Sequence, residues 1–151
     1  MNTKKIIKSI IEWIIYILIF VAIVYGTPKI LAKVLDTPYP IAAITSSSMW
    51  PVLKVGDLVF IKGVSERSQI NLGEIVVYNN NPSASSGQAG FTIHRLVKLD
   101  EETFITKGDA NNVDDQPVKY QELIGKTVNL KGQPLRIPYL GKLSQIFNKR
   151  H

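Results

Sequence analysis

Three serines stand side by side at positions 46–48, in the stretch ITSSSMWP. A serine hydroxyl is a weak nucleophile by itself and needs a neighbouring base. Pro51 fixes its own φ and keeps Trp50 out of the helical region, so we expect the chain to turn just after Met49. Such a turn can present a side chain from the end of a strand, as a nucleophile elbow does. The stretch therefore predicts either a plain polar loop or a nucleophile, depending on whether the chain supplies a base.

The candidate base is one of two histidines, His94 and His151. His151 is the last residue and is set aside, because chain ends usually fray. His94 lies in FTIHRLVKL (91–99), where apolar and polar residues alternate except at Leu96. In a strand this alternation places His94 on the face opposite the most apolar set. Two interpretations stay open, a general base and an ordinary histidine at a surface or strand edge.

Candidate carboxylates follow in TKGDANNVDD (106–115), which contains Asp109, Asp114 and Asp115 within a turn-like sequence. A carboxylate beside an imidazole can orient it and stabilise its charged form. The alternative is a polar loop or a calcium loop. The spacing does not follow the D-x-[DN]-x-[DN]-G calcium pattern, so we expect no metal and no cofactor.

The elements that must position these residues are short runs rich in β-branched and aromatic residues. They read IAAIT, DLVFIK, EIVVY, FTIHRLVKL, TFITK and GKTVNL, with turn signals between them. Many short strands separated by turns predict an all-β sandwich or barrel, and residues 41–140 show no long helical period. The segment NNNPSASSGQAG (79–90) has almost no large apolar side chain, which predicts an exposed excursion between two strands.

The N-terminal part is different, since residues 6–25 read IIKSIIEWIIYILIFVAIVY. About 20 mostly apolar residues suffice to cross a bilayer. A cleavable signal would end in a small-x-small site, which YGTPKILAK does not offer, and a buried helix would show an amphipathic face. We therefore predict a single retained transmembrane anchor with its flanks in residues 1–30. Prolines 28, 38 and 40 then discourage a continuing helix, which predicts a juxtamembrane connector in 31–40 and a β domain in 41–151.

Charge bears on orientation and on partners. Lysines precede the apolar segment at positions 4, 5 and 8 and follow it at 29 and 33. This slight bias predicts a cytoplasmic N-terminus, a single-pass cell-membrane protein and an extracytoplasmic β domain.

The net charge of +6 is partly explained by attraction of the flanks to anionic lipid. No basic run interleaved with aromatics favours nucleic acid, and the absence of cysteine excludes disulfides and thiolate chemistry.

Together, in this order and behind an anchor, the motifs resemble type I signal peptidases, and more closely the endoplasmic-reticulum and archaeal kind than the usual bacterial kind. The matching segments read SSSMWPVLKVGDLVFIKG, LGEIVVY, TIHRLVKL, FITKGDANNVDD and RIPYLG. The resemblance implies a signal-peptidase-like β-sandwich or barrel catalytic domain on a single transmembrane helix. It also implies that Ser48, directly before the methionine, is the nucleophile. Ser46 and the backbone N–H of Ser48 would then bind the oxyanion.

The same resemblance implies that His94, followed by Arg95, is the general base, at a place where bacterial enzymes use lysine. Asp115 is the expected third member, with Asp109 as its alternative or as a supporting residue. The family often has glycine between the two serines, and this chain has Ser47. Residue 47 must therefore accept a φ that is open to residues other than glycine.

The implied activity is that of a membrane-bound serine endopeptidase that removes N-terminal signal peptides from secretory preproteins, cutting after small residues at −1 and −3. The implied partners are preproteins, the lipid bilayer and other membrane subunits. A second hypothesis is an anchored β domain that binds peptides or another envelope protein without catalysis. A third is a self-cleaving serine/lysine protease of the same fold, which would need a lysine where this chain has His94.

Overall fold

A computed structural model of the chain describes residues 3–64, 66–80 and 90–141. The chain divides into two compact units, Met1–Val34 and Leu35–His151. His151 and positions 81–89 of the predicted excursion lie outside the described residues.

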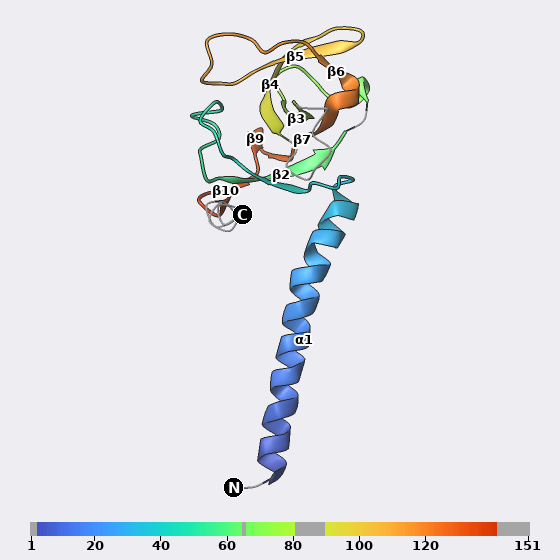
Figure 1. Cartoon of the computed structure of the whole chain (residues 1–151), viewed down its shortest axis with the longest axis vertical. Coiled ribbons are helices and arrows are strands. Elements are labelled where there is room, and N and C mark those ends of the chain that lie inside the picture. Colours follow the sequence, from blue (N-terminus) through green and yellow to red (C-terminus); the bar gives the residue numbers. More distant parts are fainter. Residues whose placement is uncertain (1–2, 65, 81–89, 142–151) are drawn as a thin grey trace. The chain divides into compact units, whose positions relative to one another are not determined.

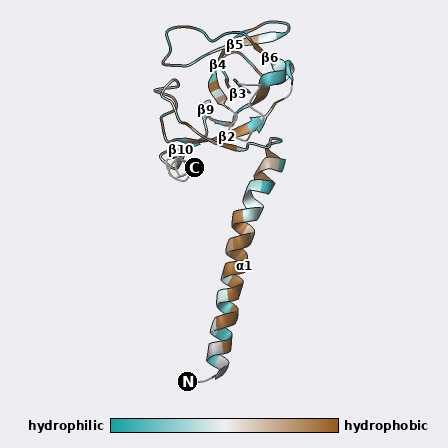
Figure 2. Ribbon diagram, in the orientation of Figure 1, coloured by the Kyte–Doolittle hydropathy of each residue, from teal (hydrophilic) through white to brown (hydrophobic). Residues whose placement is uncertain are grey.

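The first unit is one helix, α1 (Thr3–Val34), whose middle is almost continuously apolar (Figure 2). Its Ile7–Val34 portion is long and apolar enough to cross a membrane, with a mean hydropathy of 2.4. Large apolar side chains such as Trp13 and Phe20 are exposed. A helix with apolar side chains exposed all round is suited to lipid rather than to water. The single apolar N-terminal helix predicted from the sequence is confirmed.

The end of this helix differs from the prediction. We expected Pro28 to discourage a continuing helix, but α1 runs through Pro28 and ends at Val34. A proline removes one hydrogen bond from the helical ladder, while the turns on either side keep theirs, and apolar spanning helices tolerate that loss. Pro38 and Pro40 do lie beyond the helix.

The second unit is built mainly of β strands that curl around a core (Figure 1). The strands are β1 (Ile41–Ala43), β2 (Leu58–Gly63), β3 (Ile75–Asn79), β4 (Phe91–Leu99), β5 (Thr103–Lys107), β6 (Val118–Lys119), β7 (Leu123–Thr127), β8 (Asn129–Leu130), β9 (Gln133–Pro134) and β10 (Arg136–Ile137). The large sheet has the order β1-β2-β7-β3-β4-β5-β6, with β10 also paired to β2, and its pairings are antiparallel. Two 3₁₀ turns, η1 (Arg67–Gln69) and η2 (Tyr120–Glu122), join strands. The mainly β fold is confirmed.

Apolar side chains form two core clusters. The first contains Val64, Ile70, Val76, Tyr78, Leu96, Phe104 and Leu123. The second contains Ile44, Met49, Leu53, Val59 and Ile75. Met49 and Leu53 flank the serines on their C-terminal side and are almost fully buried. Burial of such a side chain is worth about 1.5–3 kcal/mol, so these two residues fasten the serine segment to the core.

Strand β4 buries the face that carries His94 and Leu96, which are 9% and 1% exposed. These two residues share one face by ordinary strand alternation. After them Leu96 pairs with Thr106, whereas Lys98 pairs with Ile105, so Val97 is an extra residue in a bulge. Val97 is 38% exposed, and the bulge shifts which of the following side chains face inward. The prediction that the face opposite His94 is the buried one was wrong for this half of the strand, and the surface interpretation of His94 is excluded.

Candidate active site

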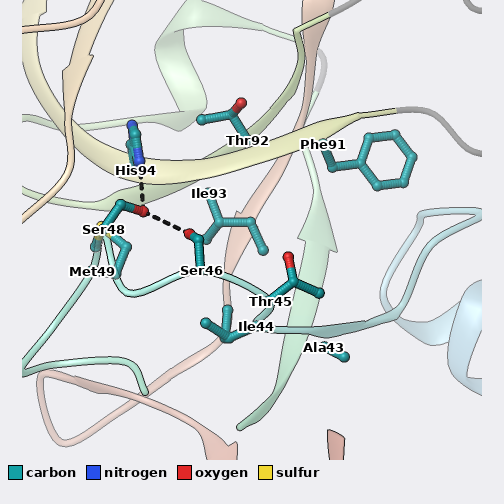
Figure 3. A pocket seen from close by; sticks show the side chains of 10 residues that line it. All are labelled: Ala43, Ile44, Thr45, Ser46, Ser48, Met49, Phe91, Thr92, Ile93 and His94. Carbon is teal, nitrogen blue, oxygen red and sulfur yellow. Dashed lines mark hydrogen bonds between the residues drawn. The ribbon is translucent and has the colours of Figure 1, made fainter. Parts of the chain in front are cut away.

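The serine loop, residues 44–53, is held at both ends. Its first residue donates a backbone N–H to the Asp57 carbonyl at 2.8 Å, and Leu53 donates one to Met49 at 2.8 Å. The buried Met49 and Leu53 side chains leave the serines on the outer side of the loop. Ser48 points from there toward β4 (Figure 3).

Ser48 meets His94 directly (Figure 3). The Ser48 Oγ lies 3.0 Å from His94 Nε2, and the Ser46 Oγ lies 3.0 Å from Ser48 Oγ. The His94 side chain is 11% exposed, so the contact is largely shielded from water. A hydroxyl this close to a ring nitrogen is within reach for proton transfer.

The other ring nitrogen of His94 faces a carboxylate. His94 Nδ1 lies 2.6 Å from Asp115 Oδ2, and the Asp115 backbone N–H donates to the Thr106 carbonyl at 2.8 Å. An ionised carboxylate accepts hydrogen bonds but does not donate them, so Nδ1 carries the hydrogen and Nε2 is free to accept from Ser48. The structure thus brings Ser48, His94 and Asp115 into one chain of hydrogen bonds.

Asp109 has a different partner. Arg95 donates from Nε and Nη2 to the two carboxylate oxygens of Asp109, each at 2.7 Å, and from Nη1 to the Gly73 carbonyl at 2.7 Å. The hydrogen bond to Asp109 raises the pKa of Arg95 above its ordinary value. This two-pronged ion pair ties β4 to the loop that follows β5, and the bond to the Gly73 carbonyl ties β4 to the turn before β3. The sequence left Asp109 and Asp115 as alternatives, and Asp115 is the one that contacts His94.

The chain is similar to proteins of known name. A scan against protein-family models finds no match. The signal peptidase complex catalytic subunit SEC11 of Chaetomium globosum is 36% identical over 91 residues, covering 58% of this chain and 50% of the relative. That of Pyricularia oryzae is 31% identical over 119 residues, covering 75% and 66%. Subunit SEC11C of Canis lupus familiaris is 35% identical over 118 residues, covering 72% and 57%.

The chain belongs to the endoplasmic-reticulum kind of the type I signal peptidase family. It spans about half the length of the first of these relatives.

Ser47 replaces the glycine that signal peptidases often have between the two serines. The predicted turn is present, since residues 48–52 form a turn and the Trp50 N–H donates to the Ser47 carbonyl at 3.0 Å. Among the described residues, a positive φ at a non-glycine occurs at Asp36, Lys131 and Tyr139. Ser47 therefore has a backbone conformation open to any residue, and the departure from the family pattern carries no strain.

The acid loop, residues 108–115, packs against the serine loop. The Ala110 N–H donates to the Ser48 carbonyl at 2.8 Å. A Cβ at Gly108 would lie 2.7 Å from that same carbonyl oxygen and 2.7 Å from the Asn111 side chain. Glycine is required there because the two loops approach so closely. The GD motif of this signal-peptidase-like chain thus positions the backbone of Ser48 as well as the two aspartates.

A cavity of about 310 Å³ opens beside Ser48, between the serine loop and the start of β4 (Figure 3). Ile44, Phe91 and Ile93 give it apolar walls, and Ser46, Ser48 and His94 contribute polar atoms. The cavity thus presents both apolar and polar surface beside the Ser48 hydroxyl.

Sequence reasoning missed two residues of the site. Thr106 donates its hydroxyl to Asp115 Oδ2 at 2.6 Å, and the Tyr78 hydroxyl lies 3.4 Å from the same oxygen. Burial, chiefly, raises the pKa of Tyr78 above its ordinary value. Both lie in runs that read as ordinary strands, TFITK and EIVVY. The signal available in the sequence was that Thr106, two residues before the acid loop, shares the strand face of the apolar Phe104.

Proposed function

We infer that this protein is a membrane-bound serine endopeptidase that removes N-terminal signal peptides from secretory preproteins. The observation that carries this proposal is the continuous hydrogen-bonded series Ser48–His94–Asp115 beside an apolar-walled cavity. Membership of the signal peptidase family supports the substrate class. The proposal assigns the nucleophile to Ser48, the general base to His94 and the orienting carboxylate to Asp115.

In the first step the Ser48 oxygen attacks the scissile peptide carbonyl while His94 Nε2 accepts its proton. Asp115 keeps the hydrogen on Nδ1 and stabilises the imidazolium that forms. The imidazolium then returns the proton to the leaving amine, which breaks the peptide bond and leaves an ester on Ser48. A water, deprotonated by the same imidazole, hydrolyses this ester and restores the serine.

The negative oxygen of the tetrahedral intermediate needs donors. The Ser46 hydroxyl, 3.0 Å from the attacking oxygen, and the backbone N–H of Ser48 are the two groups assigned to it. In the resting enzyme the Ser46 hydroxyl is bonded to Ser48, and it reorients toward the oxyanion as that charge develops. Loss of one such donor typically raises the barrier by roughly 3–4 kcal/mol.

The substrate binds as an extended segment with small residues at −1 and −3. The cavity offers strand-like backbone on both sides, from residues 43–46 and from 91–94, which can pair with an extended peptide. Its volume of about 310 Å³ is shared by several side-chain positions, which favours small residues at each. The α1 anchor holds the enzyme in the bilayer that also holds the apolar part of the signal, which raises the local concentration of substrate.

The proposed topology places the N-terminus in the cytoplasm and the β domain outside it, in the cell membrane, on the basis of lysines 4, 5 and 8 ahead of the span. The relatives are named as subunits of a signal peptidase complex. We extend this to the present chain as an expectation of other membrane subunits.

The test is cleavage of a preprotein by the full-length chain, purified in mild detergent with any subunit that it retains. A preprotein with alanine at −1 and −3 should be cut after −1, as shown by the mass of the mature product. The same preprotein with leucine at −1 should stay intact, and Ser48→Ala enzyme should cut neither. Folded wild-type enzyme that binds the preprotein but cleaves no faster than Ser48→Ala would favour the anchored peptide-binding domain instead. A serine/lysine self-cleaving protease is disfavoured because the base position holds His94.

A further inference from the structure

The Asp115 carboxylate contacts other side chains besides that of His94. Its Oδ2 oxygen lies 2.6 Å from His94 Nδ1, 2.6 Å from Thr106 Oγ1 and 3.4 Å from the Tyr78 hydroxyl. The Thr106 and Tyr78 oxygens are themselves 3.1 Å apart. An ionised carboxylate only accepts hydrogen bonds, so the Thr106 hydroxyl donates to Asp115, and Tyr78 can donate to Asp115 or to Thr106. Three side chains therefore converge on one carboxylate oxygen.

Three neighbouring strands supply these groups. Tyr78 on β3 is opposite Thr92, Thr106 on β5 is opposite Leu96, and both partners share the β4 face of His94. Opposite residues in a sheet point to the same side, so the three side chains meet on one face. Thr106 lies on that face because it pairs with Leu96, just before the register shift between Leu96 and Lys98.

Burial makes this arrangement rigid. Thr106 is 0% exposed and Tyr78 is 3% exposed. A buried hydroxyl without a hydrogen-bond partner lowers the stability of the fold, which favours the hydrogen bonds of these two hydroxyls to Asp115 and to each other. Because burial, more than any other cause, raises the pKa of Tyr78, its hydroxyl keeps its proton and remains a donor across the physiological range.

We propose that Tyr78 and Thr106 are positioning residues for the proposed peptidase reaction, fixing the rotamer and charge distribution of Asp115 so that its Oδ2 stays aimed at His94. This inference rests on the proposed function and deepens it. The two hydroxyls draw off part of the carboxylate charge and prevent its rotation. Without these hydroxyls Asp115 is less well oriented. Its carboxylate also keeps more of its negative charge, which stabilises the imidazolium form of His94 more strongly.

Removal of either hydroxyl should change both rate and pH profile. For Thr106→Val we expect kcat to fall about 10-fold or more, with KM nearly unchanged, since a hydrogen bond to a charged group is lost. The acidic limb of kcat/KM should move to higher pH, because a proton on His94 becomes harder to remove. Other charged groups near Asp115 stay in place in this variant, namely Lys119 and Glu122 across the adjoining cavity and the Lys107–Asp114 pair.

The experiment compares Thr106→Val, Tyr78→Phe and Thr106→Ser with a matched control, Thr127→Val. Thr127 is also a buried strand threonine, 3% exposed, but its hydroxyl bonds the Ile75 carbonyl and Asn129. Rates and pH profiles are measured with the full-length enzyme, and melting temperatures report folding. Thr106→Ser should keep most of the activity, and Thr127→Val should keep the wild-type profile. If Thr106→Val does not fold, Tyr78→Phe and Thr106→Ser still carry the test.

An Asp115→Asn background separates positioning from general damage. If Thr106 acts through Asp115, adding Thr106→Val to Asp115→Asn should cost little more than Asp115→Asn alone. The inference is overturned if Thr106→Val and Tyr78→Phe keep the wild-type rate and profile, or if they change kcat no more than Thr127→Val does. Wild-type enzyme that does not cleave at all would instead refute the proposed function itself.

Discussion

Two neighbouring residues of β4 each bind an aspartate of the same loop, and the two pairs have different roles. His94 lies 2.6 Å from Asp115, and Arg95 lies 2.7 Å from Asp109. Side chains of successive strand residues point to opposite faces, so one pair faces Ser48 and the other faces the Gly73 carbonyl. Proximity of a basic side chain to a carboxylate therefore does not identify a catalytic pair, whereas the third group that each pair contacts does.

Burial separates the two pairs only in part. The side chains of His94 and Asp115 are 11% and 22% exposed, and those of Arg95 and Asp109 are 33% and 14% exposed. What differs is proton chemistry. An imidazole gives and takes protons near neutral pH, whereas Arg95, whose pKa Asp109 raises further, stays charged throughout. Each prediction below tests one side of this difference.

The largest expected effect is that of Asp115→Asn. The amide keeps the shape of the side chain but no longer holds the hydrogen on His94 Nδ1, so we expect kcat to fall about 10²- to 10⁴-fold. The melting temperature should change little by comparison. The kcat is measured by preprotein cleavage, and the melting temperature is measured by thermal unfolding of the same sample. A near-wild-type kcat would remove Asp115 from the proposed triad.

Ser46→Ala tests the polar group on the far side of Ser48 from His94. Its hydroxyl is assigned to the oxyanion rather than to proton transfer, so slow cleavage should remain, about 10²- to 10³-fold below wild type. Single-turnover rates distinguish this from complete loss. An unchanged rate would mean that the backbone supplies the oxyanion donors alone.

Asp109→Asn should separate the second pair from the first. It leaves the Arg95 guanidinium without its carboxylate in a half-buried position, so we expect the free energy of unfolding to fall by about 1–3 kcal/mol. The kcat should fall by less than about 10-fold, since Asp109 does not contact His94. Chemical denaturation and cleavage assays on one preparation supply both numbers. A kcat loss equal to that of Asp115→Asn would show that the two pairs are not separable.

The smallest expected effect concerns alkaline stability. Because burial raises the pKa of Tyr78 in the folded state, that state holds its proton more tightly than the unfolded chain does. The stability that this group contributes is complete below the ordinary tyrosine pKa of 10.0 and is lost as pH rises through the folded-state pKa. The melting-temperature difference between wild type and Tyr78→Phe should therefore shrink between pH 8.5 and pH 11 by a few degrees at most. A gap that grows with pH would contradict the direction of this shift.

Much of this arrangement follows from the sequence. Alternating apolar runs and turn signals predict the strands, and the resemblance of the serine, histidine and aspartate motifs to those of signal peptidases predicts which residues meet. The sequence did not distinguish Asp109 from Asp115, because both lie in one polar turn and their partners are set by the face of β4 on which each neighbour projects. The apolar pattern of β4 did not show which of its faces is buried, because Leu96 breaks that pattern, and Tyr78 and Thr106 reach Asp115 only through strand register. Pro28 misled the prediction of the helix end for a similar reason, since local propensity is outweighed by the hydrogen bonds of the flanking turns.

The central claim is that the Ser48 hydroxyl and the His94 imidazole act as one unit. The most direct test is a double-mutant cycle on preprotein cleavage with wild type, Ser48→Ala, His94→Ala and the double variant. We predict that each single substitution lowers kcat/KM by at least about 10³-fold and that the double variant is no slower than the slower single one. A His94→Ala enzyme near the wild-type rate, or losses that multiply in the double variant, would contradict the account.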